Sequence, residues 1–150
     1  AQSITIDLPL PAYLPTDFIE DMSLRIQLYR RLANIARVAE LDALEAELLD
    51  RFGKLPKAVE GLTYQIRVKL LAQLAGATAI ATENGRIHVR LPYLGSIDRM
   101  ALQNYLGDTV RVSRTAIWLP PDLGDGQWQP MLVELLHNLK REAFSPMFKE

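Results

Sequence analysis

Residues 78–91 read TAIATENGRIHVRL, and this stretch decides the fold class. Apolar and polar residues alternate on both sides of Asn84-Gly85, and Asn-Gly between two alternating runs is the strongest short-range signal of a β-hairpin. Because side chains two apart share a face of a strand, the second run predicts an apolar and a polar face. These faces are made by Ile87, Val89 and Leu91 and by Arg86, His88 and Arg90.

Before this hairpin, apolar residues recur every three or four positions, which predicts three amphipathic helices. Gly53 and Gly76 are expected to end the second and the third. Earlier still, residues 4–10 alternate like a strand, and the prolines that follow confine this strand to a sheet edge. The predicted helices span residues 17–36, 41–52 and 56–75. In the first of them, the stripe predicted to face the core is Met22, Ile26, Tyr29 and Ala33, widened by Leu24, Leu28 and Ile35.

After the hairpin, the pattern predicts a short helix, two more strands and a last helix. Ser96 or Asp98 is positioned to cap the short helix, and Pro130 to open the last one. The predicted ranges are 98–106, 110–113, 116–119 and 130–143. The sequence thus predicts a single α+β domain over residues 1–150, in which N-terminal helices pack on a small, mostly antiparallel sheet closed by a C-terminal helix.

Composition narrows the function classes. The 150 residues include 17 Lys and Arg against 18 Asp and Glu, and this balance argues against a strongly basic nucleic-acid binder. The absence of Cys excludes disulfides, thiolate metal sites and cysteine nucleophiles. Neither a signal peptide nor an apolar run of membrane-spanning length is present, so we expect a cytoplasmic protein without membrane contact. Because the chain begins at Ala1 rather than Met, we expect a piece of a longer protein.

Catalytic motifs are missing from the sequence. A phosphate-binding P-loop requires Gly-Lys followed by Ser or Thr, whereas Gly53-Lys54 is followed by Leu55. The Gly-x-Gly at residues 124–126 lacks a third glycine and is interpreted as a turn. His88 and His137 lie far apart, and neither belongs to a metal-binding motif. We therefore predict no catalytic residue, no metal site and no cofactor in this chain.

An acidic pair on the second helix is the sharper of two charge clusters. Glu47 and Asp50 are three residues apart, so they share a helix face roughly opposite the apolar side, and Arg51 can pair with Glu47. One interpretation is an ordinary polar face. The other is a docking patch for a partner that carries arginine, because charge-assisted hydrogen bonds give orientation and specificity.

The second cluster is basic. Between Arg51 and Lys69 only Glu60 opposes five cations, and further arginines on the predicted strands could share one sheet face. The alternative function is therefore a nucleic-acid-binding module that contacts phosphates, against the simpler interpretation of a solvated surface. The cations are Arg51, Lys54, Lys57, Arg67 and Lys69, with Arg86, Arg90, Arg111 and Arg114 on or beside the strands.

Three segments resemble the C-terminal domain of bacterial transcription-repair coupling factors. Residues 47–56, ELLDRFGKLP, are similar to the family's signature helix and turn. Residues 8–15, LPLPAYLP, are similar to its proline-rich entry, and residues 24–33, LRIQLYRRLA, to its first helix. The resemblance is specific over about residues 4–80, and beyond them only the order of the elements agrees.

This resemblance implies a regulatory rather than a catalytic role. The parent would be an ATP-dependent, helicase-like DNA translocase that displaces stalled RNA polymerase and recruits UvrA for nucleotide excision repair. Its ATP and Mg²⁺ would bind to a motor outside this chain. The family's terminal domain packs on the N-terminal UvrB-like domain of the same protein and masks its UvrA-binding surface. Carried onto this sequence, the interdomain contact would be made by Glu47, Asp50 and Arg51.

Overall fold

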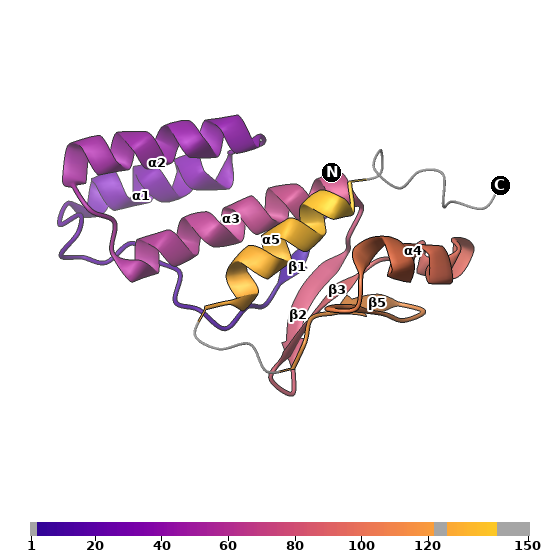
Figure 1. The fold of residues 1–150 in the computed structure, drawn as a ribbon. Helices are drawn as coiled ribbons and strands as arrows, with labels where there is room; N and C mark the ends of the chain where they lie inside the picture. Colours follow the sequence, from indigo (N-terminus) through magenta and orange to yellow (C-terminus); the bar gives the residue numbers. More distant parts are fainter. Residues whose placement is uncertain (1–2, 122–125, 141–150) are drawn as a thin grey trace. The chain divides into compact units, whose positions relative to one another are not determined.

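The computed structural model describes residues 3–121 and 126–140, which divide into two compact units (Figure 1). Residues 9–70 form one unit, called here the helical unit. Residues 1–8 and 71–150 form the other, the sheet unit. The α+β class is confirmed, since five helices and a five-stranded sheet occur in the described part of the chain. The single domain that the sequence predicts stays a prediction.

The helical unit contains α1 (Met22–Ala33), α2 (Val38–Phe52) and the larger part of α3 (Lys57–Ala75). The helix α1 begins later than predicted because the Asp21 carboxylate caps it, accepting hydrogen bonds from the backbone N–H groups of Ser23 and Leu24. The end predicted for α2 is confirmed: Gly53 adopts a φ of 81°, a conformation that glycine tolerates at a helix end.

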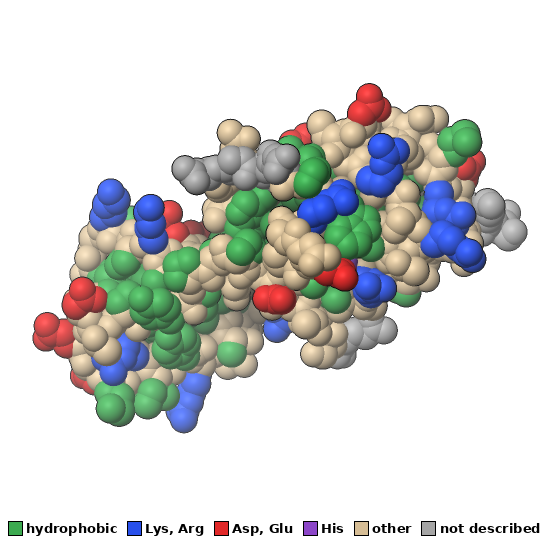
Figure 2. All heavy atoms as spheres, turned by 90° about the horizontal axis from the view of Figure 1, so that it is seen from below, with side chains coloured by type: hydrophobic (Ala, Val, Ile, Leu, Met, Phe, Trp, Pro, Cys, Tyr) green, Lys and Arg blue, Asp and Glu red, His purple; other side chains and the backbone are tan. Residues whose placement is uncertain are grey.

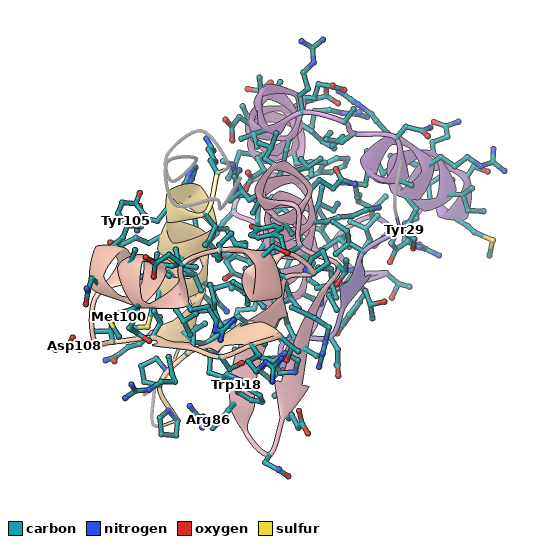
Figure 3. All side chains as sticks on the ribbon, turned by 90° about the vertical axis from the view of Figure 1, so that its right-hand side faces the viewer. Tyr29, Arg86, Met100, Tyr105, Asp108 and Trp118 are labelled. Carbon is teal, nitrogen blue, oxygen red and sulfur yellow. The ribbon has the colours of Figure 1, made fainter. Side chains whose placement is uncertain are left out.

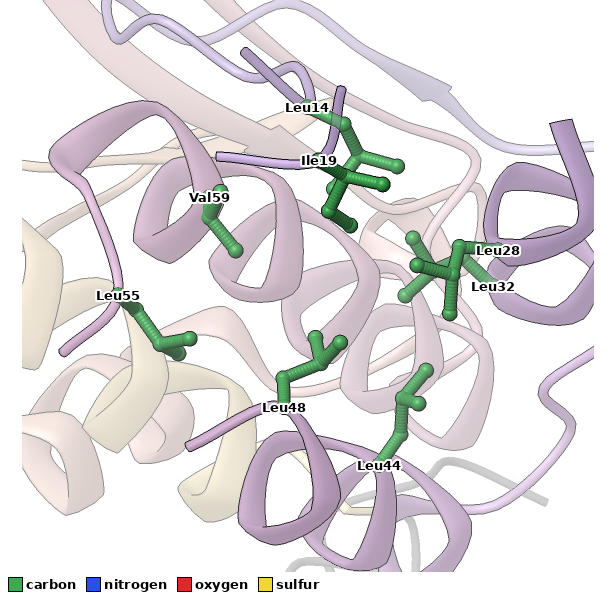
Figure 4. Close-up of a cluster of buried hydrophobic side chains, with 8 residues drawn as sticks. All are labelled: Leu14, Ile19, Leu28, Leu32, Leu44, Leu48, Leu55 and Val59. Carbon is green, nitrogen blue, oxygen red and sulfur yellow. The ribbon is translucent and has the colours of Figure 1, made fainter. Parts of the chain in front are cut away.

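One continuous hydrophobic core lies inside this unit (Figure 4). Side chains from all three helices and from the proline-rich segment fill it, and the rings of Phe18 and Phe52 pack at its edge with centroids 5.3 Å apart. The buried members are Leu14, Ile19, Leu28, Leu32, Leu44, Leu48, Leu55 and Val59.

The main core-facing stripe predicted for α1 is wrong, but the residues predicted to widen it, Leu24, Leu28 and Ile35, do belong to the core or pack against it. Leu28 is only 3% exposed and, with Leu32, faces the core, whereas Met22 is 65% exposed and Ile26 and Tyr29 also face solvent. Two sets of apolar residues in α1 have helical spacing, and periodicity alone does not say which of them is buried. Hydrophobic side chains accordingly gather on the surface of the helical unit (Figure 2).

The proline-rich segment is held against two helices of the helical unit. The Tyr13 N–H donates to the Ala58 carbonyl of α3 at 3.1 Å, and the Leu14 N–H donates to the Tyr29 hydroxyl of α1 at 2.7 Å. At Gly61 the segment comes so close that a Cβ atom there would lie 1.9 Å from the Pro11 carbonyl oxygen. Only glycine therefore fits this position of α3.

The sheet unit contains five strands in the order β1-β2-β3-β5-β4. The strand β1 lies parallel to β2 at the sheet edge, as predicted for it, and every other pairing is antiparallel. Asn84 and Gly85, with φ values of 53° and 75°, form the predicted hairpin turn. The strands are β1 (Thr5–Ile6), β2 (Ala79–Glu83), β3 (Arg86–Arg90), β4 (Arg111–Val112) and β5 (Ala116–Trp118).

Two helices, α4 (Arg99–Leu106) and α5 (Trp128–Asn138), lie on the same side of this sheet (Figures 1 and 3). A 3₁₀ turn, η1 (Leu94–Ser96), precedes α4, and the Asp98 carboxylate caps α4 by accepting from the Ala101 N–H. The predicted loop at 122–125 and the predicted end of the last helix at 141–143 lie outside the described residues. Within the described ranges, every helix is too short or too polar to cross a membrane.

Candidate functional site

The two members of the acidic pair on α2 have different environments. Arg31 of α1 donates two hydrogen bonds to the Glu47 carboxylate, from its two terminal nitrogens, at 2.6 and 2.9 Å. Arg51 lies 3.8 Å from the same carboxylate, which confirms the pairing expected from their spacing of four residues. Glu47 therefore joins α1 to α2 within the helical unit.

The ionisation of Glu47 follows from this geometry. The hydrogen bonds from Arg31 are the main cause that lowers the pKa of Glu47, burial opposes them, and the positive charges of Arg31 and Arg51 add to them. The same contact raises the pKa of Arg31. Both groups stay charged at neutral pH, and the bidentate geometry fixes the orientation of the two planar groups.

Asp50, by contrast, is exposed and forms no ion pair with another residue of the described ranges. Its neighbour Leu49, in the last turn of α2, is 51% exposed and adds an apolar side chain to this surface. Their spacing along the chain gave no reason to distinguish Glu47 from Asp50. The structure distinguishes an internally bound carboxylate from one that is accessible to a partner.

The basic residues between Arg51 and Lys69 do not form one patch. Arg67 of α3 binds two carboxylates of α2, those of Asp42 at 2.7 Å and of Glu45. Lys54, Lys57 and Lys69 are exposed. At 3.6 residues per turn, the positions of the three basic residues on α3 point to different sides of the helix. The alternative function based on this cluster is therefore not favoured by the arrangement.

The sheet arginines lie together more closely. The register places Arg86 and Arg90 on the same face of β3 as His88, and it pairs His88 with Trp118 and Trp118 with Arg111. His88 is 4% exposed, although the sequence placed it on a polar face, because the Trp118 ring packs on it with a centroid distance of 4.5 Å. Burial is the main cause that lowers the pKa of His88; the charge of Arg90 adds to this, and Glu83 opposes it.

We also searched the described residues for a metal site and for a catalytic arrangement of side chains. In the part of the chain that the structure describes, there is no group of three or more His, Asp or Glu side chains that could hold a metal ion. His88 lies on β3 and His137 on α5. Among the described residues, His88 contacts the carboxylate of Glu83, but no nucleophilic side chain is hydrogen-bonded to either histidine.

Sequence reasoning missed Arg31 as a partner of Glu47. The two residues are 16 positions apart on different helices, whereas pairs can be inferred from sequence only at spacings of three or four within one helix. The only signal was a run of basic residues in the last turn of α1, which also favours the helix dipole and so points to no particular partner.

Comparisons with known proteins agree on one family. A family model described as "TRCF domain" matches residues 8–101. A transcription-repair-coupling factor from Mycobacterium tuberculosis is 32% identical over 90% of this chain and 11% of its own length. One from Haemophilus influenzae is 42% identical over 48% of this chain and 6% of its own length. The chain thus spans about a tenth or less of these relatives.

A solved structure agrees with the fold. The crystal structure of the C-terminal domain of a transcription-repair coupling factor superposes with a TM-score of 0.75, covering 94% of this chain and 96% of that one. At 19% sequence identity, this likeness concerns the fold alone.

Proposed function

This chain belongs to the TRCF family, the C-terminal domains of transcription-repair coupling factors, and from that premise we propose that it is a non-catalytic docking domain. Membership supports a role in transcription-repair coupling and DNA repair. The proposed partner is the N-terminal UvrB-like domain of the same protein. While the two are joined, the UvrA-binding surface of that domain is covered, and the factor is held in an inactive state.

The observation that carries this proposal is the unequal state of the acidic pair. Glu47 is oriented by Arg31 and Arg51, which fixes α2 against α1. One turn further along, Asp50 presents an unpaired carboxylate beside the exposed Leu49. An arginine of the partner domain would find a carboxylate on a rigid helix, so little conformational entropy is lost on docking. Leu49 would supply apolar contact next to the charge.

A contact of this kind suits a reversible latch. Interfaces between domains of one chain are modest in area and fairly polar, so a competing partner needs only a few kcal/mol of differential binding to open them. In the proposed factor, ATP hydrolysis, DNA translocation and displacement of stalled RNA polymerase would belong to other parts of the polypeptide, together with ATP and Mg²⁺. UvrA would bind once the latch has opened.

The test uses the full-length factor with Asp50→Ala. Removing one charge-assisted hydrogen bond across the interface is expected to raise UvrA binding about three- to tenfold. The matched control is Glu60→Ala, an exposed carboxylate on α3 of the same unit that forms no ion pair with a described residue. UvrA affinity is measured by titration. Equal affinity for wild type, Asp50→Ala and Glu60→Ala would contradict the docking role of Asp50.

A further inference from the structure

The sheet face turned away from α4 and α5 gathers arginine around tryptophan. Figure 3 shows Arg86 and Trp118 on this side of the sheet, and Figure 2 shows Lys and Arg side chains, with a few Asp and Glu, beside hydrophobic groups over the sheet unit. The register adds Arg90 and Arg111 to the same side. These four residues, Arg86, Arg90, Arg111 and Trp118, are called the arginine–tryptophan face below.

The positive charge of this face is not neutralised within the unit. Among described residues, none of its three arginines forms an ion pair with a carboxylate. Glu83 shares this side of the sheet but lies against His88, with 3.6 Å between its carboxylate and Nε2. Arg114, in the turn between β4 and β5, is a further exposed cation without an ion pair in the described ranges.

At its centre the face contains polar atoms that lack partners. The Arg86 guanidinium lies 5.1 Å from the centroid of the Trp118 ring, and the His88 ring lies 4.5 Å from it. Arg86 Nε and His88 Nδ1 are buried and make no hydrogen bond to another described residue, whereas Arg86 Nη2 donates to the Leu119 carbonyl oxygen at 3.4 Å. Buried polar atoms in native proteins are nearly always satisfied by protein or ordered water, so these two atoms beside one indole mark a place where water or a ligand supplies hydrogen bonds.

We propose that the arginine–tryptophan face binds single-stranded nucleic acid. The arginines contact phosphates, and Trp118 and the guanidinium plane of Arg86 stack with a base. Single strands suit this combination because their bases are free to stack on aromatic and arginine planes, whereas a duplex keeps its base faces covered. An acidic protein would use the arginines equally well, but in a single strand a stackable base accompanies every phosphate, which an acidic protein surface does not offer.

Overall charge sets the expected strength of this binding. The chain has a net charge of −1, so the overall charge of the chain adds no attraction to that of this face. Three phosphate contacts predict a slope of about −2 for the logarithm of affinity against the logarithm of salt concentration, from about −0.7 per contact on a single strand. Binding is therefore expected to be measurable at low salt and to weaken steeply as salt is added. This face belongs to the sheet unit, so the proposal does not depend on the docking role of Asp50.

The experiment titrates the whole chain into a labelled thymidine oligonucleotide of about 12 nucleotides, within the usual site size of single-strand binders, and records fluorescence anisotropy at several salt concentrations. Arg90→Ala with Arg111→Ala is expected to weaken binding about tenfold and to reduce the salt slope by about 1 to 2. Both positions are exposed on strands, so the fold is retained. Arg30→Ala with Lys69→Ala, exposed cations of the helical unit, removes the same charge elsewhere and is expected to have little effect.

Stacking has its own measurement. The chain has two tryptophans, so in a Trp128→Phe background the fluorescence of Trp118 alone is followed and is expected to be quenched by the oligonucleotide. No binding at low salt, or equal loss in both double variants, would overturn the proposal. So would displacement of the oligonucleotide by an equal concentration of polyglutamate, which would make the partner an acidic protein. Tighter binding of a duplex of the same length would also contradict single-strand recognition.

Discussion

Several arginines of the helical unit are bound to carboxylates, whereas those on the sheet face are not. Three helical arginines, Arg31, Arg51 and Arg67, form ion pairs with Glu47, Asp42 and Glu45. The three on the sheet face, Arg86, Arg90 and Arg111, form none within the described residues. The same type of side chain thus joins helices in one unit and stays available to a ligand in the other.

This difference separates structural charge from charge that is available to a ligand. A guanidinium held by two carboxylates must lose those bonds before it can bind a phosphate, so its contribution to binding is small. An exposed arginine without a partner loses only water and side-chain entropy. Of the acidic pair on α2, Asp50 is the carboxylate that stays accessible, whereas the arginines of the sheet face stay accessible as cations. The contact proposed for the helical unit is therefore acidic, and the one proposed for the sheet unit is basic.

The comparison of the two units requires that each unit packs independently of the other. Gly61→Ala tests this requirement, and of the substitutions proposed it is expected to have the largest effect on stability. The new Cβ would lie 1.9 Å from the Pro11 carbonyl oxygen, so the proline-rich segment must move away from α3. Overpacking of this kind costs about 1–3 kcal/mol of unfolding free energy. Hydrogen exchange is expected to accelerate in residues 9–70, while oligonucleotide binding by the sheet unit is retained.

Gly95→Ala is the control for Gly61→Ala. Gly95 has open space around its Cβ position and no positive φ, so the substitution is expected to leave the denaturant midpoint unchanged. If Gly61→Ala accelerated hydrogen exchange equally in β2, β3 and β5, the two units would unfold together. That result would contradict independent packing of the two units.

The sequence predicted most of this architecture because its signals were local. Asn84-Gly85 specified the hairpin, and Asp98 specified the start of α4, since both act within a few residues. The main stripe of α1 was predicted wrongly, although its widening residue Leu28 is buried, because the choice between two apolar faces depends on Leu44 and Leu48 of another helix. The contact of Gly61 with Pro11 and that of Arg31 with Glu47 join distant positions, which no periodicity reveals.

In the candidate sites, too, features set by local pattern were predicted and features set by distant residues were missed. Alternation along β3 predicted that Arg86 and Arg90 share a face, and the register confirms it. The burial of His88 depends on Trp118 of β5, 30 positions later, and it was missed. The sequence placed Glu47 and Asp50 on one face of α2, but only the contact with α1 distinguishes their roles.

Replacing one arginine from each unit tests the comparison directly, with a smaller effect than Gly61→Ala. Arg67→Ala removes a side chain that joins α3 to α2 and leaves Asp42 and Glu45 as neighbouring negative charges. Its side chain is one-quarter exposed, so we expect a loss of about 1–2 kcal/mol in unfolding free energy, measured by urea denaturation.

Arg111→Ala is the matched substitution in the sheet unit. The side chain is exposed and forms no ion pair with a described residue, so stability is expected to change by less than about 0.5 kcal/mol. Equal destabilisation by Arg67→Ala and Arg111→Ala would abolish the distinction between structural and available arginines.

The smallest expected effect is a dependence of stability on pH that originates in the sheet unit. Burial, with the charge of Arg90, lowers the pKa of His88 in the folded chain, against the opposing charge of Glu83. The unfolded chain therefore binds a proton first as pH falls below about 6.5. The contribution of neutral His88 to stability is complete above that pH and is lost progressively below it. Urea midpoints at about pH 7.5 and 5.5, above the range of carboxylate titration, measure this loss.

His88→Gln is expected to remove this slope, because glutamine keeps a polar side chain beside Trp118 but does not titrate. His137→Gln, on an exposed position of α5, is the control and is expected to keep it. If a bound single strand satisfies His88 Nδ1, the oligonucleotide should also change the slope in wild type and leave His88→Gln unaffected. A slope that persists in His88→Gln would show that another group titrates and would contradict the assignment of the pH dependence to His88.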